Sequence, residues 1–326
     1  MRSPSSHPVH LTRGYIAALS SAGFLSTTAI FIRYLTQTYQ MPALVLAGWR
    51  DLIVAISLLP ILGLFRPALL KVDKKHRAYL LAYGLLLAVF NSLWTLSVVL
   101  NGAAVSAVLV YCSAGFTALL GWWLLKERLD WSKLVAVVLC LAGCVLVSGA
   151  FNPVAWTSNL LGILTGILSG LGYAIYTLMG RKASQDGLNP WTTLLYTFGI
   201  AAVFLMLANL TMGNLLPGAA RSSAEMLIAG DSTAGWGILF LLAIGPTLAG
   251  FGLYNVSLVY LPSSVANLVV TLEPAFTAVI AYIVLKESLN AIQIIGSLII
   301  LTGVVFLRVY EGWMAGRKTG THLLAE

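Results

Sequence analysis

Three charged residues, Arg50, Asp51 and Glu273, stand within long runs of apolar residues. A charge within a lipid bilayer is costly, so such side chains usually pair with one another or face a water-filled cavity. If both runs are helices, a rise of about 1.5 Å per residue places Glu273 and Arg50 at depths of roughly 15 and 18 Å from the same edge of the bilayer. At these depths the two side chains could meet. Asp51 lies about 100° further round the helix than Arg50, so we expect these neighbours to point in different directions.

Two interpretations of Glu273 follow from this placement. In the structural one, Glu273 and Arg50 form a fixed buried pair, or cap backbone groups that Pro274 frees, and neither acts on a solute. In the functional one, Glu273 exchanges a proton or faces a bound solute, because it is an acid at mid-depth beside a helix break. All four histidines lie outside the apolar runs, so any proton coupling must use Glu273 or Asp51, and we expect no other cofactor.

Polar and aromatic side chains also occur on the apolar runs that could surround a cavity. Such groups can bind a small amphipathic solute by stacking and hydrogen bonding. Alternatively, the aromatic residues anchor helix ends at the membrane interface, and the Asn and Ser residues bond between helices. The candidates for the cavity, besides Glu273, are Ser21, Asn91, Trp94, Tyr111, Ser113, Tyr173, Tyr176, Tyr254, Asn255 and Asn267.

The chain offers little for metal binding or catalysis. Its three cysteines, Cys112, Cys140 and Cys144, all fall in apolar runs, and an odd number there does not describe a disulfide framework. Cys140 and Cys144 share a helix face, but small apolar packing explains them better than a metal pair. The sequence contains no HExxH and no Walker-type Gly-rich loop, and we find no Ser-His pair within the runs. We therefore expect no metal, no catalytic residues and no enzyme.

Composition identifies the surroundings in which these side chains must be held. Of the 326 residues, 59% are hydrophobic and only 9% are charged, against about 25% in soluble domains. So few charges cannot cover a water-facing surface, and the long continuous apolar runs favour membrane helices over a barrel. The net charge of +8 comes largely from short connections between runs, such as residues 66–77. That pattern indicates contact with lipid head groups and argues against nucleic acid as a partner.

The runs predict an all-α integral membrane protein of ten transmembrane helices, each near the ~20 residues that a bilayer requires. Counting Lys and Arg gives 15 on the side of the N-terminus and 3 on the other, so both termini should be cytoplasmic. The connection 213–233 contains a stretch, 219–229, that could form a short helix lying on the membrane. The predicted spans are 14–35, 42–65, 78–99, 103–125, 133–150, 159–180, 189–212, 234–258, 263–285 and 291–311.

The sequence also repeats itself. Phe116-Thr117-Ala118 recurs as Phe276-Thr277-Ala278, and Leu125-Lys126-Glu127 recurs as Leu285-Lys286-Glu287, both at an offset of 160. Nearer the start of each half the offset is 148, as in Gly14 and Gly162 or Arg33 and Arg181. Five helices are an odd number, so the second copy must enter the membrane from the opposite side. The sequence thus predicts two inverted five-helix repeats, 14–150 and 159–311, between cytoplasmic tails 1–13 and 312–326.

These features together resemble the EamA-type transporters of the drug/metabolite transporter superfamily, over about residues 14–311. The resemblance rests on the doubled unit, the acidic residue closing helices four and nine, Arg50, Leu272–Phe276, and the glycine-containing ends 143–146 and 303–306. It implies a central cavity lined by helices one, three, four, six, eight and nine, and transport of small metabolites, often amino acids. The twin of Glu273-Pro274 is Ser113-Ala114, so no proline predicts a matching kink in helix four.

We therefore expect a secondary transporter that exports a small metabolite, an amino acid or a similar amphipathic solute, across a bacterial inner membrane by alternating access. A uniporter or a channel-like permease is the alternative. A membrane-embedded enzyme or a receptor is a less favoured one. The expected partners are the lipid bilayer and a small-molecule substrate, and a homodimer remains open. The sequence does not name the substrate.

Overall fold

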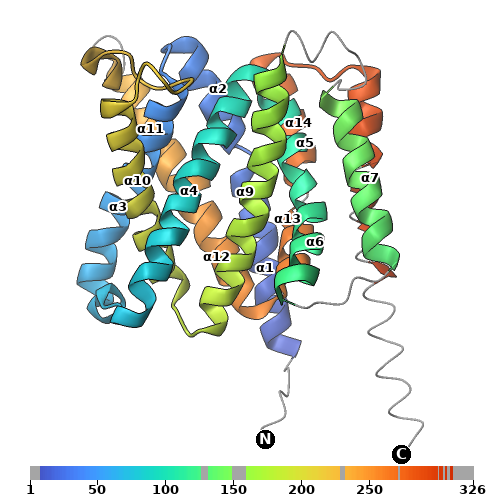
Figure 1. Cartoon of the computed structure of the whole chain (residues 1–326), viewed down its shortest axis with the longest axis horizontal. Helices are drawn as coiled ribbons and strands as arrows, with labels where there is room; N and C mark the ends of the chain where they lie inside the picture. Colours follow the sequence, from blue (N-terminus) through green and yellow to red (C-terminus); the bar gives the residue numbers. More distant parts are fainter. Residues whose placement is uncertain are drawn as a thin grey trace, which may run out of the picture.

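The computed structural model describes residues 8–125, 131–148, 159–227, 232–270, 272–299, 301–303, 305–306 and 309–310. Helices and turns account for the regular structure of these residues, and no strand occurs among them. Most helices run up or down along one common axis, so that the molecule is a single bundle (Figure 1). The predicted all-α class is confirmed.

The helices follow one another with short connections in both halves of the chain. In the first half they are α1 (Pro8–Leu25), α2 (Thr28–Thr38), α3 (Ala43–Phe65), η1 (Pro67–Leu70), α4 (Lys74–Asn101), α5 (Ala103–Leu109), η2 (Val110–Cys112), α6 (Ser113–Leu125) and α7 (Trp131–Ser148). In the second half they are α9 (Leu160–Gln185), α10 (Pro190–Thr211), η3 (Ser223–Met226), α11 (Thr233–Leu242), η4 (Ala243–Phe251), α12 (Gly252–Tyr260), α13 (Ser263–Val270) and α14 (Glu273–Leu285), before a further helix that includes residues 291–299.

Seven helical segments of the described residues are long and apolar enough to cross a membrane, which makes the chain a multi-pass membrane protein. They are Thr12–Thr38, Ala43–Phe65, Lys74–Asn101, Ala103–Leu124, Leu160–Gln185, Pro190–Thr211 and Thr233–Tyr260. Each coincides with a predicted span. The other predicted spans, 133–150, 263–285 and 291–311, correspond to α7, to α13 with α14, and to a helix over Ala291–Gly303.

Several predicted spans are interrupted helices, and of these breaks the sequence analysis anticipated the one beside Pro274. Between α1 and α2, the hydroxyls of Ser26 and Thr27 each donate to a backbone carbonyl three residues back, at 2.8 Å. Such bonds compete with the helical ladder and weaken it locally. In η4, a π-helical segment, Pro246 has no N–H for the carbonyl of Leu242, and the Thr247 hydroxyl donates to that carbonyl instead at 2.8 Å.

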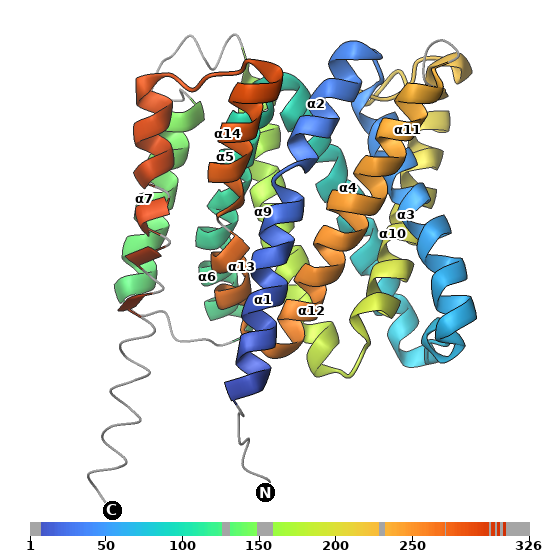
Figure 2. The same ribbon diagram turned by 180° about the vertical axis from the view of Figure 1, so that it is seen from behind.

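The fourth and ninth predicted spans are interrupted at equivalent positions. α14 begins at Glu273, next to Pro274, and α6 begins at Ser113, the residue 160 positions earlier. The break in the fourth span occurs without a proline, through the short 3-10 turn η2, so the absence of a proline was a poor guide to helix geometry there. Both breaks lie near mid-height of the bundle (Figure 2).

The connection between α10 and α11 differs from the expectation. Where the sequence suggested a short helix over 219–229, the described residues form bends and the 3-10 turn η3. The Glu225 carboxylate accepts a hydrogen bond from the backbone N–H of Arg221 at 2.8 Å, which stabilises this turn. Residues 228–231 lie outside the described part of the chain.

The outside of the bundle is apolar and its inside is partly polar, the reverse of a soluble protein. Large side chains such as Leu64 and Trp131 are 80% and 75% exposed. Arg50, Asp51 and Glu273 are buried, together with many Ser, Thr and Asn residues. Hydrocarbon chains can surround the apolar outer face, whereas the buried polar groups need partners from other helices.

Candidate cavity

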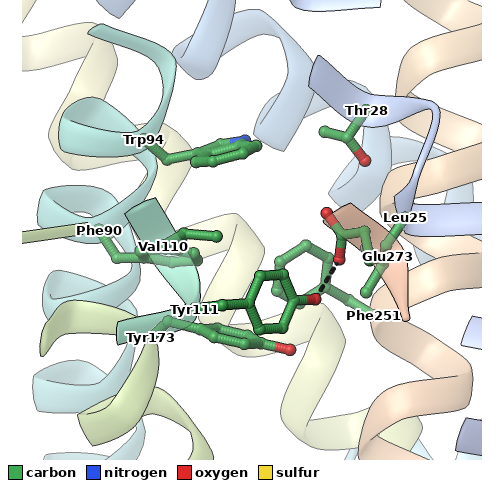
Figure 3. A pocket seen from close by; sticks show the side chains of 9 residues that line it. All are labelled: Leu25, Thr28, Phe90, Trp94, Val110, Tyr111, Tyr173, Phe251 and Glu273. Atoms are coloured by element: carbon green, nitrogen blue, oxygen red, sulfur yellow. Dashed lines mark hydrogen bonds between the residues drawn. The ribbon is translucent and has the colours of Figure 1, made fainter. Parts of the chain in front are cut away.

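A small cavity lies where four of the helix breaks meet. Its lining comes from the ends of α1 and α2, from the middle of α4 and α9, from η2, from the end of η4 and from the start of α14. These are the six spans that the resemblance implies. The lining residues are Leu25, Thr28, Phe90, Trp94, Val110, Tyr111, Tyr173, Phe251 and Glu273 (Figure 3). Interrupted helices leave backbone and side-chain groups free to face the space between the helices.

The cavity is closed in this conformation. The space open to the centre of a water-sized sphere is about 30 Å³. A single water molecule needs about 10–15 Å³ on this measure, so the cavity holds roughly two water positions. Known sites for small molecules enclose several hundred Å³. The helices around the cavity must therefore separate before any small molecule larger than water can enter.

Glu273 is the sole carboxylate in the lining, and its side chain is 6% exposed. The Tyr111 hydroxyl lies 2.6 Å from Oε2 of Glu273 and 2.8 Å from the carbonyl oxygen of Val270. No Lys, Arg or His of the described residues lies within ion-pair distance of this carboxylate. Figure 3 shows the second oxygen turned away from Tyr111, on the side of Thr28. Position in the first turn of α14 stabilises a negative charge through the helix dipole.

Arg50 does not pair with Glu273 among the described residues, so the fixed pair of the structural interpretation is absent. Its Nε lies 3.3 Å from Oδ1 of Asp51, and Asn91 donates from Nδ2 to both Asp51 oxygens at 2.9 and 2.8 Å. The expectation that Arg50 and Asp51 point apart was wrong. Their Cα–Cβ bonds diverge, but three methylene groups let the guanidinium fold back to its neighbour. The estimated depths of the charged residues in the membrane showed which of them could meet. They did not determine the direction in which each side chain points.

Behind the cavity, the predicted tyrosines form a stack that links α4, α9 and α12. The Tyr173 ring lies between Phe90 and Tyr254, with both centroid distances at 5.6 Å. Tyr254 exchanges a hydrogen bond of 2.8 Å with Thr177, which orients its hydroxyl. Of these rings, Phe90 and Tyr173 line the cavity and Tyr254 supports them.

Comparison with known proteins agrees with this architecture. The EamA-like transporter family matches the chain twice, over residues 12–149 and 160–309. The chain belongs to this family. An uncharacterized transporter of Clostridium kluyveri is 24% identical over 90% of this chain and 93% of its own length. The threonine/homoserine exporter RhtA of Salmonella typhimurium is 27% identical over 76% of this chain and 77% of its own length. A solved crystal structure with 15% identity covers 92% of this chain and 98% of its own, with a TM-score of 0.64, which shows a shared fold.

The other predicted residues of this EamA-like transporter lie outside the cavity lining, and all but Ser113 bond between or within helices. Asn255 pairs with the Tyr176 hydroxyl, at 3.1 Å from Nδ2 and 3.3 Å from Oδ1. Ser21 donates to the carbonyl of Gly250 at 2.8 Å, and Asn267 donates to Thr117 at 3.3 Å. Ser113 is buried, and its hydroxyl has no partner among the described residues. Of the predicted residues, Trp94, Tyr111, Tyr173 and Glu273 line the cavity, and the others do not.

Sequence reasoning missed five lining residues: Leu25, Thr28, Phe90, Val110 and Phe251. Four of them are apolar, and nothing in an apolar run separates a lining residue from a packed one. Thr28 carried a usable signal, because it follows Ser26 and Thr27 in the middle of a span. Three consecutive hydroxyl residues are a recognisable cause of local helix distortion.

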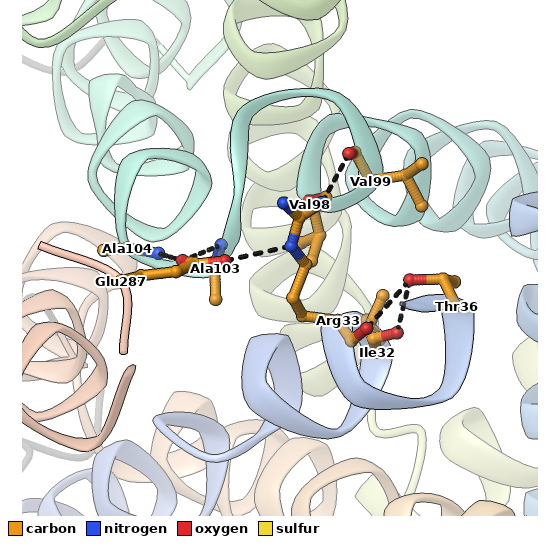
Figure 4. Close-up of polar contacts among 8 residues, drawn as sticks. All are labelled: Ile32, Arg33, Thr36, Val98, Val99, Ala103, Ala104 and Glu287. Carbon is orange, nitrogen blue, oxygen red and sulfur yellow. Dashed lines mark hydrogen bonds and ion pairs between the residues drawn. The ribbon is translucent and has the colours of Figure 1, made fainter. Parts of the chain in front are cut away.

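A second polar cluster closes the upper end of the bundle in Figure 1, above the cavity. Arg33 of α2 binds Glu287 through Nε at 2.9 Å, and its Nη1 donates to the carbonyl of Val99 at 2.6 Å. The Glu287 carboxylate also accepts from the backbone N–H of Ala103 at 2.8 Å, at the start of α5 (Figure 4). We call these residues, Arg33, Glu287 and the start of α5, the upper clasp. It joins the end of the first span to the third, fourth and ninth spans.

Replacing Tyr111 by Phe should disturb Glu273 without changing the shape of the cavity. The variant removes the hydroxyl that donates to the carboxylate, and hydrogen bonds to charged groups contribute about 1.5–3 kcal/mol. We expect the rate of transport to fall, because the carboxylate loses the donor that fixes its orientation in the cavity. The initial rate of transport would test this. Tyr282→Phe, on the exposed outer face, is the matched control, and identical rates for both variants would contradict the prediction.

Proposed function

We propose that this protein is a secondary transporter that exports a small metabolite, an amino acid or a similar amphipathic solute, across the bacterial inner membrane by alternating access. The observation that carries the proposal is the closed cavity at mid-height, built from interrupted helices and containing one buried carboxylate. Homology to a threonine/homoserine exporter supports both the class of solute and the direction. A closed cavity supports a mechanism in which the solute is enclosed before release.

Contacts between the halves support an architecture of two inverted five-helix repeats. Helices approach so closely at Gly14 that a Cβ there would lie 2.8 Å from Cγ of Leu261. At Gly162, 148 positions later, a Cβ would lie 2.5 Å from Oδ1 of Asn101, which is 160 positions before Leu261. Both offsets are those of the sequence repeat. Each half therefore packs the start of its first span against the end of the other half's third span.

The two equivalent arginines make the same contact within each half. Arg33 donates through Nη1 to the carbonyls of residues 98–99, at 3.5 and 2.6 Å. Arg181 donates through Nη1 to the carbonyls of residues 258–259, at 2.7 and 3.5 Å. The first pair of contacts lies at the upper end of the bundle and the second at the lower end (Figure 1). An inverted repeat places equivalent contacts at opposite ends of the bundle. These contacts therefore support a mechanism in which either end can open to its side of the membrane.

Charge supports cytoplasmic termini. The lower end of the bundle, where α1 begins, carries the connection 66–73 and the start of α4 (Figure 1). This region holds Arg66, Lys71, Lys74, Lys75 and Arg77, whereas the described upper connections hold Arg221 and Lys286. Basic residues are retained on the cytoplasmic side. The lower end is then the cytoplasmic end, and the upper clasp faces the periplasm.

Reconstitution in liposomes tests the function. We expect uptake of a radiolabelled amino acid to saturate and to be accelerated by unlabelled solute on the opposite side. Such counterflow requires a carrier with one set of sites exposed alternately, whereas a channel gives flux without it. A uniporter would show counterflow without any response to an imposed pH gradient, and a proton-coupled transporter would respond to that gradient. Saturable uptake that is absent for every small metabolite tested would overturn the proposal.

A further inference from the structure

The chemistry of the cavity lining points to one part of a solute. Five of its nine residues are aromatic, and Glu273 is its one carboxylate. Among the described residues of the lining there is no Lys, Arg or His. Cationic nitrogen is attracted both to a carboxylate and to the faces of aromatic rings. An anionic group, by contrast, would find no side chain of opposite charge in this lining.

Two hydroxyl groups of the lining are buried. Oγ1 of Thr28 forms no hydrogen bond with the described residues, and the hydroxyl of Tyr173 lies beside that of Tyr254. Buried polar atoms are nearly always hydrogen-bonded in native proteins, so unpaired ones in a cavity indicate a missing ligand or water. Both residues line the cavity with Glu273, and Figure 3 shows Thr28 above the carboxylate and the Tyr173 hydroxyl below the Tyr111 ring. Each oxygen can accept a hydrogen bond from an ammonium group.

The size of the closed cavity agrees with such a group. Space for roughly two water positions accommodates an ammonium group, which is close to water in size, while a larger solute body needs the helices to separate. A buried carboxylate without a cationic neighbour is unfavourable in the empty protein. A bound cation removes that cost, so the empty site favours cations over neutral solutes.

We propose that the cavity recognises the ammonium group of a primary amine, through Glu273, the Thr28 and Tyr173 hydroxyls and the faces of Trp94 and Tyr111. The inference rests on the proposed transport function and narrows its substrate class. Because the lining supplies no cation for a carboxylate, an amine binds more tightly than the amino acid with the same side chain. Amino-acid amides and simple organic amines are therefore better ligands than free amino acids.

Binding to the purified full-length protein tests this with matched triplets of probes. Each triplet contains an amino acid, its carboxamide, which keeps only the cation, and its N-acetyl derivative, which keeps only the anion. Threonine and phenylalanine provide a small and a large triplet, and amines from methylammonium to phenethylamine extend the series. Equilibrium binding is measured by Trp fluorescence and by thermal shift at pH 8. We expect the carboxamide to bind at least about tenfold more tightly than the amino acid, and the N-acetyl derivative not to bind.

Variants separate the ammonium site from general effects. Glu273→Gln keeps the shape of the carboxylate and removes its charge, so amine affinity should fall at least about tenfold. Trp94→Leu should weaken amine binding about threefold or more through loss of the ring face. The control is Glu225→Gln, which removes an exposed carboxylate at the upper end and should leave binding unchanged. Thermal unfolding of each variant without ligand confirms that it is folded.

Flux in liposomes distinguishes the two proposals. Amines that bind but are never moved would contradict transport and leave the ammonium site intact. Amino acids that are bound and moved more readily than their carboxamides would overturn the ammonium inference and leave transport intact. Binding of no amine in the series, or amine binding that Glu273→Gln leaves unchanged, would also overturn the inference.

Discussion

Replacing Asp51 by Asn is expected to lower the free energy of unfolding by about 3–5 kcal/mol, the cost of leaving one partner of a buried ion pair without the other. Asp51 is 0% exposed and Arg50 is 1% exposed, so water cannot compensate for the loss. One nitrogen of Arg50, Nη2, already has no hydrogen-bond partner. The new amide would also turn an N–H group toward Nδ2 of Asn91, which now donates to both Asp51 oxygens. Thermal unfolding in detergent measures the change.

A second substitution, at Asn91, should restore the stability that Asp51→Asn loses. In the double variant Asp51→Asn with Asn91→Asp, the carboxylate moves from α3 to α4, and the new amide donates to it while its oxygen still accepts from Arg50. We expect the double variant to be more stable than Asp51→Asn alone. Asp186→Asn is the control, because Asp186 is 42% exposed in its side chain and its bond to Lys182 contributes little. A double variant no more stable than the single one would show that charge pairing is not what Asp51 contributes.

This cluster also marks the limit of what the sequence could tell. Composition and run length indicated a helical membrane protein, because the hydrophobic effect selects lipid as the solvent for such a chain. A buried acid at Glu273 could be recognised, since an uncompensated charge in an apolar run needs a reason to be there. The direction in which a long side chain points could not be predicted from the sequence. Arg50 folds back on Asp51 because packing of α3 against α4 brings Asn91 beside them. Contacts between two helices cannot be predicted from the spacing of residues along one of them.

The cavity shows the same division between composition and packing. Trp94, Tyr111 and Tyr173 were expected there because aromatic and hydroxyl groups stand out in apolar runs. Leu25 and Phe251 were not expected, because an apolar lining residue has the same chemistry as its packed neighbours. Helix breaks decide which of them face the cavity, and the sequence marks these breaks only at prolines and at the hydroxyl residues Ser26 to Thr28. The break before Ser113 arises without proline, at the 3-10 turn η2.

Disrupting the upper clasp is expected to open the cavity toward the periplasm. The Glu287 carboxylate holds Arg33 on one side and the N–H groups of Ala103 and Ala104 on the other, at 2.9, 2.8 and 3.4 Å. Charge-assisted hydrogen bonds contribute about 1.5–3 kcal/mol each, and about 1.4 kcal/mol shifts a two-state equilibrium tenfold. Glu287→Ala should therefore raise the population of the open form at least about tenfold. Thr28→Cys, placed in the cavity wall, would then react correspondingly faster with a membrane-impermeant thiol reagent added from outside.

Exchanging the two charges tests whether the clasp is more than an ion pair. In the double variant Arg33→Glu with Glu287→Arg, opposite charges still face each other, but a guanidinium now meets the N–H groups at the start of α5, which cannot accept from it. The positive end of the helix dipole also repels it. We expect this variant to label as fast as Glu287→Ala, while Glu225→Gln at the same end labels at the original rate. If the exchange restored slow labelling, Arg33 and Glu287 alone would hold the upper end closed, and α5 would have no part in it.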